Sequence, residues 1–204
     1  MRKFFTILTV ALFASLSLMA QKKKFHVKLD YGLKTGINVT HFHLDNLRDQ
    51  TEKSFNSKWR TGFVFGLFVK VPIYKGFSIQ PEFLYSSMGG DYRTITQNHV
   101  RARYNYFSIP VLGKYNFCKH WSVFAGPQFD FLIQGKESSG SGSYKVSDNL
   151  KDFDILATGG LEFWASKHIV FQVRYMRGFN DVDLRANGVR YYSEGVQGTF
   201  GVRF

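Results

Sequence analysis

Seven charged residues stand inside otherwise apolar segments of this chain, and their types could support proton transfer or ion conduction. In chain order they are Lys34, Glu82, Lys114, Asp130, Glu162, Arg174 and Arg203. Carboxylates beside cations serve as general acids and bases in enzymes, and charged side chains also line ion paths. Buried charges of both signs persist for a structural reason as well, provided that they are paired and hydrogen-bonded. The elements that carry these residues decide between the two interpretations.

The charged residues belong to segments in which apolar and polar residues alternate. The pattern is clearest at the end of the chain, where every second residue from Val196 to Phe204 is apolar or glycine. A period of two is that of a β-strand with one apolar and one polar face. Eight such strands are predicted, at residues 25–39, 59–73, 77–86, 104–117, 121–134, 153–165, 168–178 and 191–204.

The connections between these strands alternate in length. Tight turns occupy residues 74–76, 118–120 and 166–167. Long polar connections occupy residues 40–58, 87–103, 135–152 and 179–190. A membrane strand needs only about 9–11 residues, and short turns on one side with long loops on the other are typical of outer-membrane barrels. The sequence therefore predicts an all-β fold, an eight-stranded antiparallel up-and-down transmembrane β-barrel with short periplasmic turns and long extracellular loops.

The two faces of the predicted strands differ in volume, and this difference indicates which face is inside. The apolar face carries aromatic rings such as Phe65 and Phe171, whereas the opposite face carries glycines such as Gly66 and Gly160 among polar residues. An eight-stranded barrel has an interior just wide enough for side chains to fill. The aromatic face should therefore contact lipid. A soluble, lipocalin-like barrel with the faces reversed is the alternative.

With this orientation, the seven charged residues face the lumen. We predict that they form an internal ion-pair network that plugs it, with Glu82 and Lys114 on neighbouring strands as the favoured pair. This structural plug is favoured over catalysis or ion conduction. The sequence contains no phosphate-binding loop, nucleophile elbow or zinc-ligand spacing, so no catalytic residue, cofactor or metal site is predicted. His41 and His43, followed by Asp45, form only a weak metal-binding pattern.

Prolines and aromatic residues give two further expectations about shape and membrane depth. Pro81, Pro110 and Pro127 lie inside predicted strands. Proline lacks an amide hydrogen, so we predict bulges or bends at these positions. Aromatic rings near the strand ends are predicted to form belts at the two membrane interfaces. Tyr104 and Tyr106 are assigned to the outer belt, and Trp164 to the inner belt.

The N-terminus has the parts of a secretory signal peptide. Arg2 and Lys3 precede an apolar run over residues 4–20, which is short for a membrane-spanning helix. Cleavage is predicted after Ala20, with Ser17 as the alternative. The chain is thus divided into a signal peptide at residues 1–20 and one outer-membrane β-barrel domain at residues 21–204, exported to the bacterial outer membrane.

The chain is strongly basic, with a formal net charge of +12 and a pI near 9.8. Such a charge balance first suggests nucleic acid as a partner. The basic residues, however, do not gather on one helix or stripe, and the chain is predicted to be exported. The anionic groups of outer-membrane lipid and lipopolysaccharide are therefore predicted to balance the positive charge of the chain, and no nucleic acid is expected to bind.

Five short strings stand out in the predicted strands: Lys-x-Gly-x-Asn at 34–38, Gln-Pro-Glu at 80–82, Ile-Pro at 109–110, Ala-Gly-Pro-Gln at 125–128 and Arg-Tyr at 174–175. They resemble the PorT-like family of small outer-membrane barrels, which are similar in type to OmpA and OmpX. The last strand also resembles the closing strand of outer-membrane barrels. This resemblance implies that Phe204 is part of the signal read by the barrel-insertion machinery.

These observations lead us to expect a non-enzymatic integral outer-membrane β-barrel protein with a plugged polar lumen. Its role is expected to be structural, or to be the binding of a surface partner through the long loops. Some members of the resembled family are accessories of protein secretion, so an accessory of a secretion system is the alternative function. A lipid A-modifying membrane enzyme is a third possibility, which would need a Ser, His and acid cluster near the outer leaflet.

Overall fold

The structure is a computed structural model that describes residues 29–46, 58–93, 99–139, 142–145, 152–179 and 189–204. The described residues form strands joined by turns and bends, and none of them forms a helix long and apolar enough to cross a membrane. The strands are β1 (Asp30–Asn46), β2 (Arg60–Tyr74), β3 (Phe77–Arg93), β4 (His99–Asn116), β5 (Trp121–Ser139), β6 (Gly142–Lys145), β7 (Phe153–Trp164), β8 (Ile169–Gly178) and β9 (Val189–Arg203).

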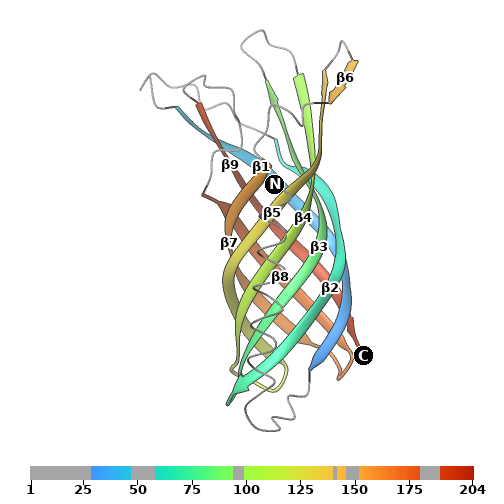
Figure 1. Ribbon diagram of the computed structural model, residues 1–204, viewed down its shortest axis with the longest axis vertical. Coiled ribbons are helices and arrows are strands. Elements are labelled where there is room, and N and C mark those ends of the chain that lie inside the picture. Colours follow the sequence, from blue (N-terminus) through green and yellow to red (C-terminus); the bar gives the residue numbers. More distant parts are fainter. Residues whose placement is uncertain (1–28, 47–57, 94–98, 140–141, 146–151, 180–188) are drawn as a thin grey trace, which may run out of the picture.

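Eight of these strands close into an antiparallel barrel, which Figure 1 shows from the side. Neighbours along the chain pair with each other, and the barrel closes where β1 pairs with β9. The remaining strand, β6, pairs only with the distal part of β5, from Lys136↔Lys145 to Ser139↔Gly142. Closure leaves no unpaired strand edge around the barrel wall, which is the condition for crossing a lipid bilayer with strands. The prediction of an eight-stranded antiparallel barrel is confirmed.

The strands are longer than the sequence pattern predicts at the end that carries the long connections. β3 and β4 stay paired as far as Arg93↔His99, and β5 continues to Ser139. These extensions are rich in glycine, serine and charged residues, which interrupt the apolar alternation that marks the rest of the strands. Backbone pairing needs only amide and carbonyl groups, and the ladder therefore continues beyond the apolar part. Residues 25–28 of the first predicted strand and the predicted signal peptide at 1–20 lie outside the described residues.

The apolar face of the strands is on the outside of the barrel. Leu33, Phe65 and Phe171 have 47–55% of their surface exposed, whereas the alternate residues are buried. Aromatic rings meet across neighbouring strands on this outer face, as Phe65 and Tyr85 do with ring centroids 5.3 Å apart. Such a surface is favourable in lipid and costly in water. The orientation with the aromatic face outward is therefore confirmed, and the lipocalin-like alternative is not supported.

Three residues predicted to lie in the aromatic belts face the inside of the barrel, so their assignment to the belts is wrong. Tyr104 and Tyr106 are buried inside the barrel, at 5% and 2% exposure. Trp164 lies inside the end of the barrel, where its indole nitrogen donates to Glu162. The period of two explains all three cases. Residues an even number of positions apart on a strand face the same side. Tyr104 and Tyr106 therefore face inward with Ser108, and Trp164 faces inward with Glu162.

Pro81, Pro110 and Pro127 do not shift the register of the ladders they belong to, so the bulges predicted at these three positions are wrong. Pro81 pairs with Val111 and Pro110 pairs with Gln128, and the register is the same before and after each proline. Two residue pairs next to each of these positions are missing from the ladder, because a proline cannot donate. The register shifts of the structure lie instead between Pro72 and Tyr74 and between Asn105 and Tyr106.

Glycines on the inner face allow neighbouring strands to approach closely. A Cβ built on Gly36 would overlap the carbonyl oxygen of Gly198 and the Cα of Thr199 on β9. The same kind of overlap with a neighbouring backbone would occur at Gly66, Gly126 and Gly160. Glycine at these positions lets the strands coil tightly around a narrow interior.

Replacing Gly36 by Val is expected to destabilise the barrel by about 1–3 kcal/mol, the usual cost of overpacking. Gly198 is the matched control, because a Cβ there would meet nothing within 4 Å. The Gly198→Val variant should stay within about 0.5 kcal/mol of the wild type. Urea unfolding in detergent micelles, followed by the mobility of unheated protein on gels, compares the two. Equal midpoints for both variants would contradict the close approach at Gly36.

Candidate functional site

The middle of the lumen is occupied by Glu82, a carboxylate with no solvent exposure. Lys34 on β1 donates to its Oε1 at 2.6 Å, and Arg174 on β8 donates to its Oε2 at 2.6 Å. Gln80, two residues earlier on the same face of β3, donates to Oε1 at 2.7 Å. Both carboxylate oxygens are thus engaged, and each of the two cations is itself at most 4% exposed. Removing such a charge from water is costly unless partners of this kind replace the water.

A second ion pair lies closer to the end that carries the short turns. Lys114 on β4 forms a salt bridge with Oε1 of Glu162 on β7, and both residues are at most 2% exposed. The indole nitrogen of Trp164 donates to the same oxygen at 2.7 Å. Glu162 is therefore held by one cation and one neutral donor from its own strand.

Two glutamines join these ion pairs into a ring of hydrogen bonds. Lys114 donates to Oε1 of Gln80 at 2.8 Å, and the amide of Gln80 in turn donates to Glu82. On the other side, Lys34 donates to Oε1 of Gln172 at 2.9 Å, and the amide of Gln172 approaches Oε2 of Glu162 at 3.4 Å. Each glutamine accepts from a cation and donates to a carboxylate, which a side-chain amide can do at once. We refer to these six residues and Arg174 as the lumen ring; they are Lys34, Gln80, Glu82, Lys114, Glu162, Gln172 and Arg174.

The lumen ring touches every strand of the barrel. Its own members come from β1, β3, β4, β7 and β8. Phe68 of β2 lies under the ammonium group of Lys34 at 5.2 Å, and Phe124 of β5 lies under the guanidinium group of Arg174 at 5.6 Å. The hydroxyl of Thr199 on β9 points to Gln172 at 3.5 Å. Cations over aromatic faces are stabilised further when water is excluded. The ring therefore cross-links the barrel wall from inside.

The predicted pairing of Glu82 with Lys114 is wrong. In the β3–β4 register Lys114 faces Ser78, which is four residues before Glu82 on the same strand. Four residues of strand span about 13 Å, too far for a direct ion pair. Gln80 lies between them and carries the connection. Neighbouring strands suggested the pair, but the register, which the sequence pattern does not show, sets the partners.

Five of the seven charged residues singled out in the sequence belong to the lumen ring, and two do not. Arg203 donates to Asp30 at 3.1 Å near the end with the short turns, where both side chains are partly exposed. Asp130 accepts from the amide of Gln128, at 3.0 and 3.2 Å, and lies opposite Asp154 in the β5–β7 register. The glutamines were missed because they carry no charge. Their parity, equal to that of Glu82 and Arg174, would have placed them in the lumen.

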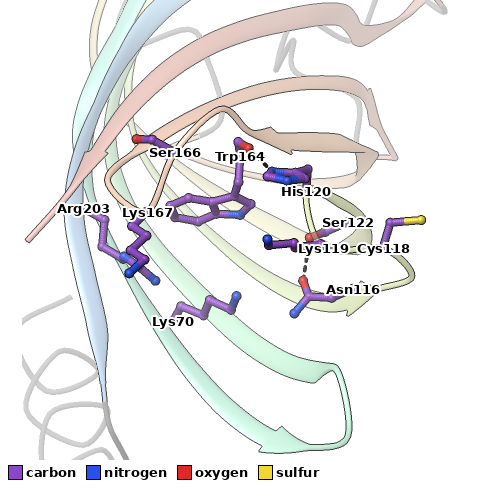
Figure 2. Close-up of a pocket in the computed structure, with 10 residues that line it drawn as sticks. All are labelled: Lys70, Asn116, Cys118, Lys119, His120, Ser122, Trp164, Ser166, Lys167 and Arg203. Atoms are coloured by element: carbon purple, nitrogen blue, oxygen red, sulfur yellow. Dashed lines mark hydrogen bonds between the residues drawn. The ribbon is translucent and has the colours of Figure 1, made fainter.

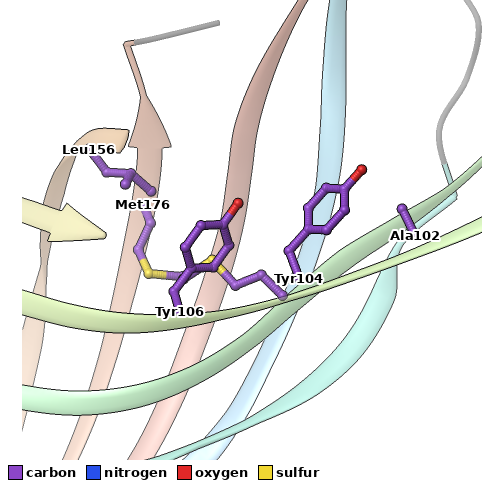
Figure 3. Close-up of a cluster of buried hydrophobic side chains, with 6 residues drawn as sticks. Ala102, Tyr104, Tyr106, Leu156 and Met176 are labelled. Carbon is purple, nitrogen blue, oxygen red and sulfur yellow. The ribbon is translucent and has the colours of Figure 1, made fainter. Parts of the chain in front are cut away.

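Above the ring, toward the end with the long connections, the lumen filling becomes less charged. Asn38 donates to Ser86 at 2.9 Å and accepts from Gln197 at 2.7 Å. Beyond this layer, a hydrophobic cluster fills the barrel, as Figure 3 shows for most of its members. The cluster consists of Met88, Ala102, Tyr104, Tyr106, Leu156 and Met176. In the described residues, the ionic ring is thus followed along the barrel axis by amide and apolar side chains, with the buried carboxylates of Asp130 and Asp154 among them.

The arrangement limits what the charged residues can do chemically. A general acid or base must come within hydrogen-bond distance of a substrate, whereas the carboxylates of Glu82 and Glu162 are buried and already accept from several donors. Among the described residues, no group of three His, Cys, Asp or Glu side chains is placed to hold a metal ion. His41 packs its ring edge-on against Trp59 at 4.0 Å. The side chains of His43 and Asp45 lie outside the described residues.

Comparison with known proteins identifies relatives at the level of family and fold. The family described as "Outer membrane protein beta-barrel domain" matches residues 19–184. No curated protein matches the chain by sequence.

Among solved structures, the chain is similar to the attachment invasion locus protein Ail of Yersinia pestis, with 14% identity and a TM-score of 0.48, over 86% of this chain and 98% of that chain. It is also similar to Neisserial surface protein A, with 10% identity and a TM-score of 0.49, over 84% and 97% of the two chains. OprG from Pseudomonas aeruginosa has 11% identity and a TM-score of 0.43, over 88% and 97%.

Neutralising Glu82 by substitution with Gln is expected to lower the free energy of unfolding by about 3–5 kcal/mol, because Lys34 and Arg174 would then be buried without a counter-charge. The matched control is Asp91→Asn, which breaks the partly exposed pair between Asp91 and Arg60 at 3.0 Å. An exposed pair contributes only about 0–1 kcal/mol. Urea unfolding of the refolded barrels measures both, and similar losses in the two variants would contradict a dominant role for the ring.

Proposed function

Because this chain belongs to the outer membrane protein beta-barrel domain family, we propose that it is a non-enzymatic outer-membrane barrel that presents its long loops as a surface for a partner. The observation that carries the proposal is the filled lumen. Lys114, Glu82 and Arg174 are each at most 1% exposed in the middle of the barrel. Eight strands enclose space for side chains rather than for an aqueous channel. The parts left to bind anything are the two ends.

The orientation follows from the lengths of the connections. The short turns, such as Tyr74–Phe77 between β2 and β3, would face the periplasm, and the long connections would face outside. Arg101 and Arg103 are exposed on the extended part of β4, on the side of the long connections. Guanidinium groups in this position fit the phosphates of lipopolysaccharide. The predicted signal peptide at residues 1–20 would deliver the chain across the inner membrane.

A secretion-system accessory, as some PorT-like proteins are, is the second candidate. The strings that carry this resemblance contribute Lys34, Gln80, Glu82 and Arg174, and all four belong to the lumen ring. They support a shared way of building the barrel more than a shared partner. Co-purification with secretion components would favour this candidate over the first.

Trypsin added to intact cells tests the orientation and the exposed loops. The long connections contain basic residues such as Arg48, Lys53 and Arg185, so we expect cleavage there while the barrel wall stays intact. Lys119 and Lys167 in the short turns are exposed on the molecule but would face the periplasm. Mass spectrometry should find cuts at these turns only after the outer membrane is permeabilised. Cleavage at the short turns of intact cells would overturn the orientation, and with it the proposed role of the loops.

The proposed insertion signal is tested by replacing Phe204 with Ala. Phe204 is 64% exposed, and its ring centroid lies 6.2 Å from that of Tyr31, so its loss should cost the folded barrel little. Outer-membrane levels of this variant should nevertheless fall several-fold in cells. Phe200→Ala, on the same outward face of β9 and 39% exposed, is the control and should assemble normally. Both variants should refold equally well in detergent; equal membrane levels in cells would contradict a signal at Phe204.

A further inference from the structure

The barrel end with the short turns contains a cavity of about 550 Å³. Its wall is built from the end of β2, the β4–β5 turn, the β7–β8 turn and the end of β9, and Figure 2 shows these segments around the opening. A volume of this size is in the range of small-molecule sites, roughly 300–1,000 Å³. The lining residues are Lys70, Asn116, Cys118, Lys119, His120, Ser122, Trp164, Ser166, Lys167 and Arg203.

Four of the lining residues are cations that come from four different elements. Lys70 belongs to β2, Lys119 to the β4–β5 turn, Lys167 to the β7–β8 turn and Arg203 to β9. In Figure 2 their side chains lie around the indole of Trp164. Like charges gathered in one concave site raise the local potential and favour an anion there, more so beside a low-dielectric wall.

Among the described residues, the lining contains no carboxylate, and the two carboxylates that bond to its side chains, Asp30 and Glu162, are already engaged. Asp30 accepts from Arg203 at 3.1 Å, and Glu162 accepts from Lys114 and Trp164. Within the described part of the chain, no carboxylate forms an ion pair with Lys70, Lys119 or Lys167. With Asp30 set against Arg203, a charge of about +3 remains at the cavity, which matches a ligand with at least two negative charges.

Trp164 forms the centre of the cavity and is fixed in place. Its indole nitrogen donates to Glu162 at 2.7 Å, which connects the cavity to the lumen ring. The ammonium group of Lys70 lies 5.7 Å from its ring centroid and the guanidinium group of Arg203 lies 5.0 Å away. These cation–π contacts hold two of the four cations at the cavity without neutralising them. The hydroxyl of Ser166, whose oxygen accepts from the amides of His168 and Ile169, adds a neutral donor to the lining.

We propose that this cavity binds a small molecule through a phosphate or diphosphate group. A guanidinium group, three ammonium groups and the hydroxyl of Ser166 are donors suited to phosphate oxygens, and the volume leaves room for the rest of a phosphate ester. The phosphate could come from a soluble periplasmic molecule or from the headgroup of an inner-leaflet lipid, since both present the same chemistry. The site lies at the end opposite the long loops, so it is independent of the partner proposed for them.

The test uses the refolded full barrel in an uncharged detergent, with Trp59 and Trp121 replaced by Phe so that Trp164 is the remaining indole. Pyrophosphate is titrated as the soluble probe, and phosphatidylglycerol in mixed micelles as the lipid probe. We expect a saturable change in Trp164 fluorescence with at least one of them. Saturation by pyrophosphate assigns a soluble ligand, and saturation by the lipid alone assigns a headgroup.

The Lys119→Gln, Lys167→Gln double variant should weaken this binding at least tenfold. Lys75→Gln is the matched control, because Lys75 is also a turn lysine at this end but contacts Tyr74 at 5.2 Å instead of lining the cavity. It should bind like the wild type. Gel mobility of unheated protein confirms that each variant is folded. Absence of saturable binding with both probes, or equal weakening by Lys75→Gln, would overturn the proposal.

Discussion

The two cations that hold Glu82 at the centre of the lumen define the constraint on which the rest of the structure depends. An eight-stranded barrel is too narrow for a water column once side chains fill it, so a charge placed inside must find all of its partners within the protein. Glu82 meets this condition through Lys34, Arg174 and Gln80. The glutamines then become necessary, because they extend the hydrogen bonding from one ion pair to the other without adding charge.

The same narrowness explains the distribution of small and large residues. Where the strands must approach, the inner face carries glycine, as at Gly36 and Gly160, and a Cβ would overlap the neighbouring backbone. Where the wall leaves room, the inner face carries the long side chains of the ring. The outer face has no such limit, so it carries the aromatic rings that lipid accommodates at no cost. Interior filling and exterior composition are thus two consequences of one closed wall.

Much of this architecture can be predicted from the alternation of residues, and the failures show what alternation omits. The alternation alone predicts the strands, the direction of their faces and the position of Lys34, Glu82 and Arg174 in the lumen. Parity applied consistently would also have placed Tyr104 and Trp164 inside. It cannot give the register between strands, and the register decides that Lys114 faces Ser78 and pairs with Glu162. Nor can it reveal the cationic cavity, because that site assembles from the ends of four segments far apart in the chain.

The strings by which the chain resembles PorT-like barrels have a physical meaning in this structure. The strings contribute four residues to the lumen ring, namely Lys34, Gln80, Glu82 and Arg174. They therefore reflect how the buried polar groups of the interior find their hydrogen-bond partners. A chain can keep such an interior while its loops or its turn end take on any partner, since every member of the ring lies on a strand of the barrel wall. Residues at the two ends can therefore change without loss of the barrel, whereas a change in the ring would destabilise the barrel. Function in a barrel of this kind has to be sought at its ends, where charge remains uncompensated, as it does around Trp164.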